Sequence, residues 1–238
     1  PLLLILTGSE GMLPFYATSS LVLLAGIPLF IVYHQRMGHT EEKPGGLWQV
    51  FMLAPTVMLA NVVYAAAAES LLTFFPLFGM SLGLSENFTL YLMTMVGLGT
   101  KILVMPISWR ADRIDRMGML LASIDHTMAG LLAMPWQVTV PGAAEIYAFV
   151  FGGVEGMIYA LGVILIGERF KGAMLATATT MFTACWGAGT VIGPLMVGIG
   201  MDLHGPDKMA LIVFLFYALY LPMPLVSFLR RRNRQVIE

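Results

Sequence analysis

The sequence is poor in charge and in cysteine. Only 11% of its 238 residues are charged, whereas 58% are hydrophobic. A soluble domain carries about 25% charged residues, so the composition excludes an ordinary soluble domain. No basic face accompanies the net charge of −1, which argues against nucleic acid as a partner. Cys185 is the single cysteine, so we expect no disulfide framework within the chain and a small buried residue at this position.

Motifs for common chemical activities are also missing. The sequence contains no HExxH, CxxC, Walker or GxSxG motif, so nothing in it supports an ATP-driven pump. The four histidines lie at unrelated levels of the apolar stretches, which disfavours an intramembrane enzyme: His34, His39, His126 and His204. We therefore predict that the protein is not an enzyme and needs neither a cofactor nor a metal ion.

Long apolar runs are what the sequence has instead. A helix needs about 20 apolar residues to cross the hydrocarbon core of a bilayer. Seven stretches qualify: residues 13–33, 48–78, 88–109, 117–134, 142–167, 172–201 and 209–229. The sequence thus predicts an all-α integral membrane protein with seven transmembrane helices. Residues 1–6 resemble the end of an earlier span, so we expect a chain that starts inside a longer protein.

The basic residues alternate between the two sides of these spans. Eleven lysines and arginines lie in connectors of one side, one lies on the other side, and Lys101 lies within a span. Positively charged loops remain in the cytoplasm. We therefore expect a multi-pass protein of a bacterial inner membrane, with a cytoplasmic C-terminus.

One short connector carries an unusual density of charge. In "PISWRADRIDR" five of the last seven residues are charged. The segment resembles the motif Gly-x-x-x-Asp-Arg-x-Gly-Arg that follows the second helix of each half in the major facilitator superfamily. Asp112, Arg113 and Arg116 stand at matching places, whereas Ser108 and Asp115 replace the two glycines. The later stretch "GTVIGPLMVG" and the turn "LTGSEGMLPF" resemble the eleventh helix and the entry to the sixth helix of such a permease.

The resemblance implies a domain plan. Residues 1–33 would be the end of an N-terminal half, namely the tail of helix five and helix six. Residues 34–47 would be the cytoplasmic central loop, residues 48–229 the six-helix C-terminal half, and residues 230–238 a basic cytoplasmic tail. The rest of the N-terminal half of this twelve-helix bundle would then be a partner that the sequence does not contain.

The resemblance also gives the charged connector a role as a cytoplasmic gate. Asp112 would dock against the N-terminal end of the helix that begins near Gly172, which carries a partial positive charge, and against Arg169 or Lys171. The alternative is a solvated hairpin with ordinary ion pairs, worth about 0.2–0.5 kcal/mol each.

Two charged residues at depth suggest an ion pair. Lys101 and Asp125 are each twelve residues from Arg113, on opposite arms of one hairpin. Equal distances along antiparallel helices imply a similar depth, and unpaired charges in a bilayer are costly. We predict a structural pair. The alternative is that Lys101 extends to the surface while Asp125 is protonated or bonded locally.

Four further polar residues are candidates for a substrate or proton site. Glu155 lies mid-span with Tyr159 one turn later on the same face, and its carboxyl group could take up and release protons during a cycle. Glu69 and Asn61 lie on the span over residues 48–78, which by the resemblance is a second helix that lines the central cavity. For Glu155 and Glu69, a purely structural carboxyl group is the alternative.

The combined expectation is a secondary active transporter. On the resemblance it moves a small solute by alternating access, with protons as the coupling ion. Its partners are then the solute, protons and the lipid bilayer. The alternative function is a transport-inactive relative that acts as a membrane sensor or assembly partner, in which neutralising Glu155 or Glu69 would change nothing.

Overall fold

A computed structural model describes residues 46–111 and 115–235, together with the isolated positions 20 and 24. The chain divides into two units, Pro1–Glu42 and Lys43–Glu238. All helices from α3 to α11 lie in the second unit, which is the unit described below. The predicted span at residues 13–33 and the central loop up to residue 45 lie outside the described residues.

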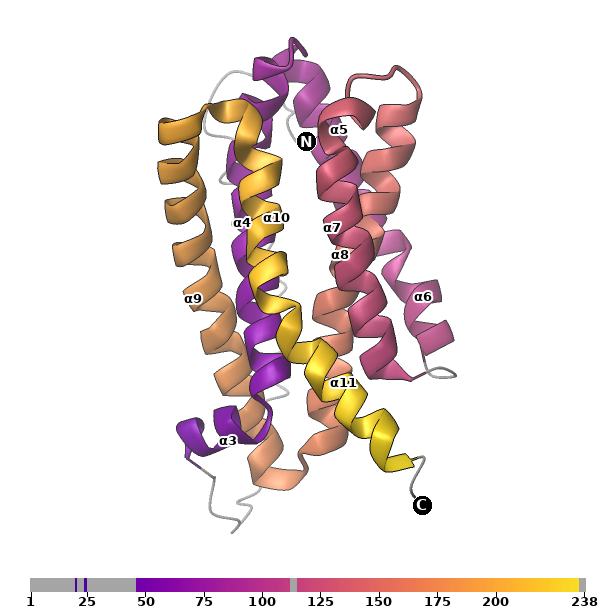
Figure 1. The fold of residues 1–238 in the computed structure, drawn as a ribbon, viewed down its shortest axis with the longest axis vertical. Helices are drawn as coiled ribbons and strands as arrows, with labels where there is room; N and C mark the ends of the chain where they lie inside the picture. Colours follow the sequence, from indigo (N-terminus) through magenta and orange to yellow (C-terminus); the bar gives the residue numbers. More distant parts are fainter. Residues whose placement is uncertain (1–19, 21–23, 25–45, 112–114, 236–238) are drawn as a thin grey trace. The chain divides into compact units, whose positions relative to one another are not determined.

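The described part of the second unit is helical throughout, without a strand (Figure 1). Its elements, in chain order, are α3 Leu47–Leu53, α4 Pro55–Ser81, α5 Glu86–Ile102, α6 Val104–Ala111, α7 Arg116–Gln137, α8 Ala143–Arg169, α9 Gly172–His204, the short 3₁₀ helix η1 Pro206–Lys208, α10 Met209–Tyr220 and α11 Pro222–Gln235.

Six segments of this unit are long and apolar enough to cross a membrane. They are Pro55–Ser81, Glu86–Pro106, Arg116–Gln137, Ala143–Arg169, Gly172–His204 and Pro206–Leu229. Each one coincides with a span predicted from the sequence. This confirms an all-helical protein with several membrane spans among the described residues.

The first of these spans differs from the prediction at its start. The sequence suggested one span over residues 48–78, but the chain breaks at Ala54, whose φ of −133° and ψ of 51° are not helical. Pro55 is the first residue of α4, where its missing N–H costs no helical hydrogen bond. The seven residues before Ala54 therefore form the separate helix α3, in which the Trp48 side chain is exposed.

Glycines allow α5 and α8 to approach each other closely. A methyl group on Gly152 of α8 would overlap the backbone of Val96 in α5, and one on Gly99 of α5 would overlap the backbone of Phe149 in α8. Thr100 uses this closeness, because its hydroxyl donates a hydrogen bond to the Gly152 carbonyl at 2.9 Å. Small residues commonly serve this purpose between membrane helices.

The pair α4 and α9 uses the same device. Methyl groups on Gly189 and Gly193 would overlap the backbones of Val62 and Ala66 in α4. The GxxxG spacing from Gly189 to Gly193 therefore faces α4 at a stretch that includes the alanines of residues 65–68. These two tight pairs, α5–α8 and α4–α9, fix the helices that carry the candidate site.

The connectors divide between two ends of the unit. The start of α7 with Arg116 and the α8–α9 connector with Arg169 and Lys171 lie at the same end as the start of α4 (Figure 1). We call this the basic end. Lys208 lies at the opposite end, next to the α9–α10 connector. The described helices thus alternate between the ends as the distribution of basic residues predicts.

Candidate functional site

Glu155 is the most deeply buried charged residue among the described positions. It lies in the middle of α8 with only 4% of its surface exposed. Its Oε1 atom is buried and has no hydrogen-bond partner. An unpaired carboxyl oxygen away from water costs free energy, so this position is not explained by stability alone.

Tyrosines from three helices lie within electrostatic range of this carboxyl group. Electrostatic interactions connect Glu155 with Tyr64 of α4, Tyr147 of α8 and Tyr217 of α10. Tyr147 donates its hydroxyl hydrogen to the Gly130 carbonyl at 2.8 Å. The Tyr217 hydroxyl, in contrast, is fully buried and lacks a partner. Two unsatisfied polar groups, on α8 and α10, therefore lie within electrostatic range of each other.

Tyr64 connects this interior to an exposed aromatic pocket. Its ring lies 6.0 Å from the ring of Tyr159 and 5.5 Å from that of Trp186. Tyr159 also packs against Phe182, with ring centroids 5.5 Å apart, and meets Trp186 edge-on at 5.3 Å. A small pocket of about 170 Å³ is lined by Tyr159, Phe182, Trp186 and Thr183. Tyr159 is 41% exposed, so the pocket opens at the surface of this unit.

Asn61 and Glu69 both lie on α4, and Asn61 contacts Phe182 of this pocket. The Asn61 amide donates a hydrogen bond to the Phe182 carbonyl at 2.6 Å, while its Oδ1 is buried without a partner. Glu69 is half-buried and interacts electrostatically with Tyr64. Of the four predicted site residues, Asn61 and Tyr159 both contact Phe182, Asn61 by a hydrogen bond to its carbonyl and Tyr159 by ring packing. Glu155 and Glu69 are connected to them through Tyr64.

The predicted ion pair between Lys101 and Asp125 is not formed. Both side chains are exposed, and neither takes part in an ion pair within the described structure. The prediction assumed that the arms of the hairpin pack on each other. Instead, α5 and α7 each pack mainly on α8, so residues at equal depth on the two arms do not meet.

The charged connector is only partly within the described residues. Asp112 and Arg113 lie outside them, so their predicted docking is not described. Arg116 begins α7, and its guanidinium forms an ion pair with Glu168 in the last turn of α8. Asp115 caps α7, because its carboxylate accepts a hydrogen bond from the Gly118 amide at 2.8 Å. The connector thus ties the start of α7 to the end of α8.

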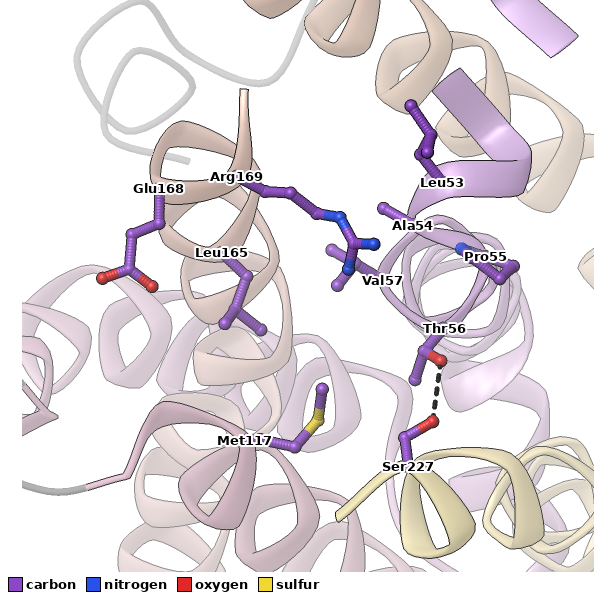
Figure 2. Close-up of a pocket in the computed structure, with 10 residues that line it drawn as sticks. All are labelled: Leu53, Ala54, Pro55, Thr56, Val57, Met117, Leu165, Glu168, Arg169 and Ser227. Carbon is purple, nitrogen blue, oxygen red and sulfur yellow. Dashed lines mark hydrogen bonds between the residues drawn. The ribbon is translucent and has the colours of Figure 1, made fainter. Parts of the chain in front are cut away.

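A larger pocket of about 550 Å³ lies beside this ion pair (Figure 2). It is formed by the start of α4, the start of α7, the end of α8 and Ser227 of α11. Thr56 and Ser227 share a hydrogen bond of 3.2 Å across it. Arg169 extends toward α4, whereas Glu168 points the other way. This pocket lies at the basic end, apart from the aromatic pocket.

Several residues of the site were not identified from the sequence. Tyr64 lies three residues after the candidate Asn61, which was the available signal for it, whereas Tyr217 lies in an apolar stretch that gave no such signal. Glu168 adjoins Arg169 in a cluster of basic residues, and an acidic residue there suggests a partner for the arginines of the neighbouring connector. Asp115 lies three residues before Gly118, the spacing of a helix N-cap.

The arrangement limits what the site can do chemically. One interior carboxyl group can hold and release a proton, and an aromatic pocket with an amide and hydroxyl groups can bind a small solute. No group of three or more His, Cys, Asp or Glu side chains in the described part of the chain is placed to hold a metal ion.

Comparison with known protein families identifies the family of this chain. The family model of the Major Facilitator Superfamily matches residues 57–237, which include α5 to α11 and most of α4. No curated protein matches the sequence at a significant level.

Proposed function

The chain belongs to the major facilitator superfamily of membrane transporters, and from that premise we propose that it moves a small solute by alternating access, coupled to protons. As a multi-pass membrane protein of this family, it works in a lipid bilayer on a small-molecule substrate. Glu155 is the proposed proton-binding group. The aromatic pocket, with Asn61 and Glu69 nearby, is the proposed contribution of this unit to the solute site.

The burial of Glu155 is the observation that carries this proposal. A carboxyl group that is 4% exposed, with an unpaired oxygen, persists in a helix whose other mid-span residues are apolar or glycine. Ionisable residues inside membrane spans are rare and mark proton or ion pathways. A neutral, protonated Glu155 suits this apolar interior, and an ionised one needs access to water or to a counter-charge. Alternating access would supply that access in one of the two states.

The exposed aromatic pocket supports a solute site next to the carboxyl group. Tyr159 and Trp186 present ring faces and a polar edge, which bind amphipathic or ring-shaped solutes. Tyr64 touches this pocket and also interacts with Glu155. A solute in the pocket would therefore be sensitive to the charge on Glu155, which is the coupling that proton-driven transport requires.

The ion pair between Arg116 and Glu168 supports a gating role for the basic end. It joins α7 to α8, and its loss would free the two helix ends to move relative to each other. We propose that Asp112 and Arg113 act with Arg116 in this gate. The basic end would face the cytoplasm, which puts the C-terminus there, in a bacterial inner membrane.

We further propose that residues 48–229 act as one six-helix half of a larger, twelve-helix bundle. Residues 1–33 would end the other half, with the tail of its helix five and with its helix six, which is the predicted span over residues 13–33. Residues 34–47 would connect the halves on the cytoplasmic side, and residues 230–238 would form a basic tail. Much apolar surface of α5 and α9 is exposed, which supports a second half or lipid as its neighbour.

Proton coupling can be tested in proteoliposomes. The whole protein is reconstituted with a pH-sensitive dye inside, and a panel of sugars, amino acids, organic anions and lipophilic cations is added outside. A transported solute should change the internal pH. Glu155→Gln, which keeps the shape of the side chain, should abolish this pH change. Glu86→Gln is the control, because Glu86 is exposed in the first turn of α5.

Each outcome separates the possible functions. A pH change that persists unaltered in Glu155→Gln would show that another group couples protons. Solute uptake without any pH change would remove proton coupling but keep transport. If no solute of the panel enters, the sensor or assembly role becomes the better account.

A further inference from the structure

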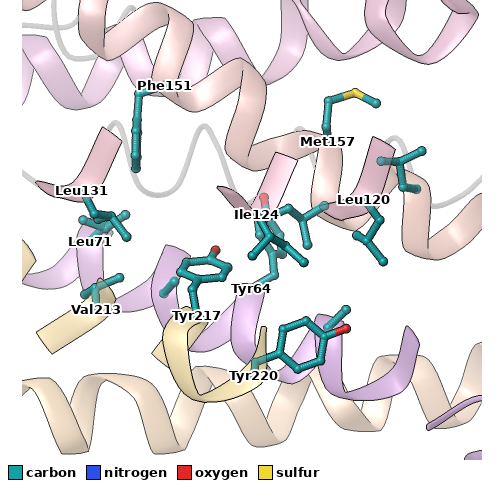
Figure 3. Close-up of a cluster of buried hydrophobic side chains, with 14 of the residues drawn as sticks. Tyr64, Leu71, Leu120, Ile124, Leu131, Phe151, Met157, Val213, Tyr217 and Tyr220 are labelled. Carbon is teal, nitrogen blue, oxygen red and sulfur yellow. The ribbon is translucent and has the colours of Figure 1, made fainter. Parts of the chain in front are cut away.

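The interior of the bundle contains a tyrosine whose buried hydroxyl group forms no hydrogen bond. Tyr217 is fully buried in α10, and its oxygen has no hydrogen-bond partner. Nearby, Tyr220 on the same helix donates its hydroxyl hydrogen to the Thr56 carbonyl at 2.7 Å. Both side chains project into the buried cluster, as does Tyr64 (Figure 3). Buried tyrosine hydroxyls usually have a partner, so Tyr217 differs from Tyr220 in a way that needs an explanation.

Glu155 is the group to which we relate the unpaired hydroxyl group of Tyr217. Its Oε1 atom is likewise buried and unpaired, and the two side chains interact electrostatically. Tyr147 is not a competitor, since its hydroxyl hydrogen is already donated to Gly130. Lys101 and Asp125 are exposed and show no interaction with this group. The titratable side chains that interact electrostatically with Glu155 include Tyr64, Tyr147 and Tyr217, and Glu69 interacts with Tyr64.

Tyr64 extends the connection to the surface. It interacts with Tyr217 and Glu155 on one side and packs against Tyr159 and Trp186 on the other. The hydroxyl groups of Tyr64 on α4 and Tyr217 on α10 therefore lie within electrostatic range of the buried carboxyl group, and the ring of Tyr64 also contacts the aromatic pocket.

We propose that Tyr217 is the positioning residue for Glu155, and that Tyr64 and Tyr217 carry protons between the aromatic pocket and that carboxyl group. With Glu155 ionised, the Tyr217 hydroxyl donates a hydrogen bond to the carboxylate, directly or through one water molecule. With Glu155 protonated, the carboxyl O–H is the donor and the Tyr217 oxygen accepts. On proton uptake, each hydroxyl passes its own proton to the next acceptor while it receives one from the previous donor. Both tyrosines end neutral, and only Glu155 changes charge.

The inference deepens the proposed function, because its biological role rests on proton coupling at Glu155. The hydrogen bond itself does not, and infrared difference spectroscopy can observe it without any solute. In the whole protein reconstituted in lipid, a pH jump should produce a carboxyl C=O stretching band that Glu155→Gln removes. Fewer hydrogen bonds to a protonated carboxyl group raise the frequency of this band.

Tyr217→Phe should move the band to higher frequency and slow its appearance after the jump by on the order of 100-fold, the size of a lost proton-transfer partner. Tyr64→Phe should slow its appearance and leave the frequency unchanged. Tyr220→Phe is the matched control, because it removes a buried hydroxyl of the same helix that has another partner, and it should alter neither. A band in Tyr217→Phe with the frequency and rate of the unsubstituted protein overturns the inference.

Two further readings keep the test decisive. If Tyr217→Phe does not fold, isotope-labelled tyrosine in the unsubstituted protein reports the same contact. The proposal requires a tyrosine C–O band to change together with the carboxyl band. A carboxyl band that appears without a change in the tyrosine C–O band contradicts the proposal. A shifted band in Tyr217→Phe combined with normal solute-dependent proton flux in Glu155→Gln would uphold the hydrogen bond and reject the coupling role. An unshifted band in Tyr217→Phe combined with loss of solute-dependent proton flux in Glu155→Gln would reject the role of Tyr217 and keep Glu155 as the coupling residue.

Discussion

Replacing Gly152 by alanine should destabilise the protein, although the same change in most helices stabilises it. Alanine is favoured over glycine in a helix by about 1 kcal/mol. At Gly152, however, the new methyl group would overlap the backbone of Val96, which has no flexible end that could move aside. The helices α5 and α8 would have to separate, at a cost of about 1–3 kcal/mol for an overpacked contact.

The separation would also stretch the hydrogen bond from Thr100 to the Gly152 carbonyl. Hydrogen bonds between membrane helices contribute about 0.6 kcal/mol on average. Set against the gain in helix propensity, the net loss for Gly152→Ala is about 0.6–2.6 kcal/mol. Gly97→Ala is the control, because a methyl group there meets no atom within 4 Å, and it should keep the full stabilisation of about 1 kcal/mol.

The two variants can be compared by unfolding in mixed micelles of a mild detergent and a denaturing one, followed by loss of helical circular dichroism. Gly152→Ala should unfold at a lower fraction of the denaturing detergent than the unsubstituted protein, and Gly97→Ala at an equal or higher fraction. If Gly152→Ala proves as stable as Gly97→Ala, the close contact between α5 and α8 is not what holds these helices together.

Three further predictions concern individual contacts, and a fourth concerns the energetic cost of the interior carboxyl group. A double-mutant cycle of Arg116→Ala and Glu168→Ala should give a coupling of at most about 1 kcal/mol that weakens in high salt, because both side chains are partly exposed; a coupling of several kcal/mol would contradict this. Asp115→Ala should cost about 1 kcal/mol of unfolding free energy and Asp115→Asn much less, since asparagine also caps helices. Asn61→Leu should lower the thermal midpoint, because it removes a hydrogen bond between α4 and α9, and an unchanged midpoint would show that this bond adds little. Glu155→Leu should raise the unfolding free energy by about 1–2 kcal/mol.

The spans could be predicted because the bilayer imposes a strong constraint on sequence. A helix that crosses hydrocarbon must satisfy its backbone internally and remain apolar for about 20 residues. All six spans of the described residues follow from this requirement. The helix break at Ala54 did not, because the residues on both sides of it are equally apolar and Pro55 is tolerated within membrane spans as well as at their starts.

The pairing of side chains between helices was less predictable. Hydropathy gives the depth of a residue but not the identity of the helix beside it, so Lys101 and Asp125 were matched by depth alone. The glycine spacing from Gly189 to Gly193 did indicate a close helix contact, and α4 is the helix that fills it. Glu155 was recognisable as a carboxyl group at depth. Its neighbour Tyr217 was not, because a tyrosine in an apolar helix has many uses, and only the packing reveals its unpaired oxygen.

The expected gain in stability for Glu155→Leu follows from the same burial that suggests its function. A buried polar group without a hydrogen bond costs about 1–3 kcal/mol by mutational measures, and Glu155 has one such oxygen. Leucine has a similar volume and no polar atom, so it should fill the space without that cost, although the Tyr217 hydroxyl would lose the partner proposed for it, which limits the expected gain to about 1–2 kcal/mol. Residues that lower stability are retained where function needs them. We therefore expect Glu155→Leu to be more resistant to thermal unfolding in detergent and inactive in proton-coupled uptake. A variant that lost stability would indicate that Glu155 is held by structural hydrogen bonds, and its role in proton coupling would then lose its main physical support.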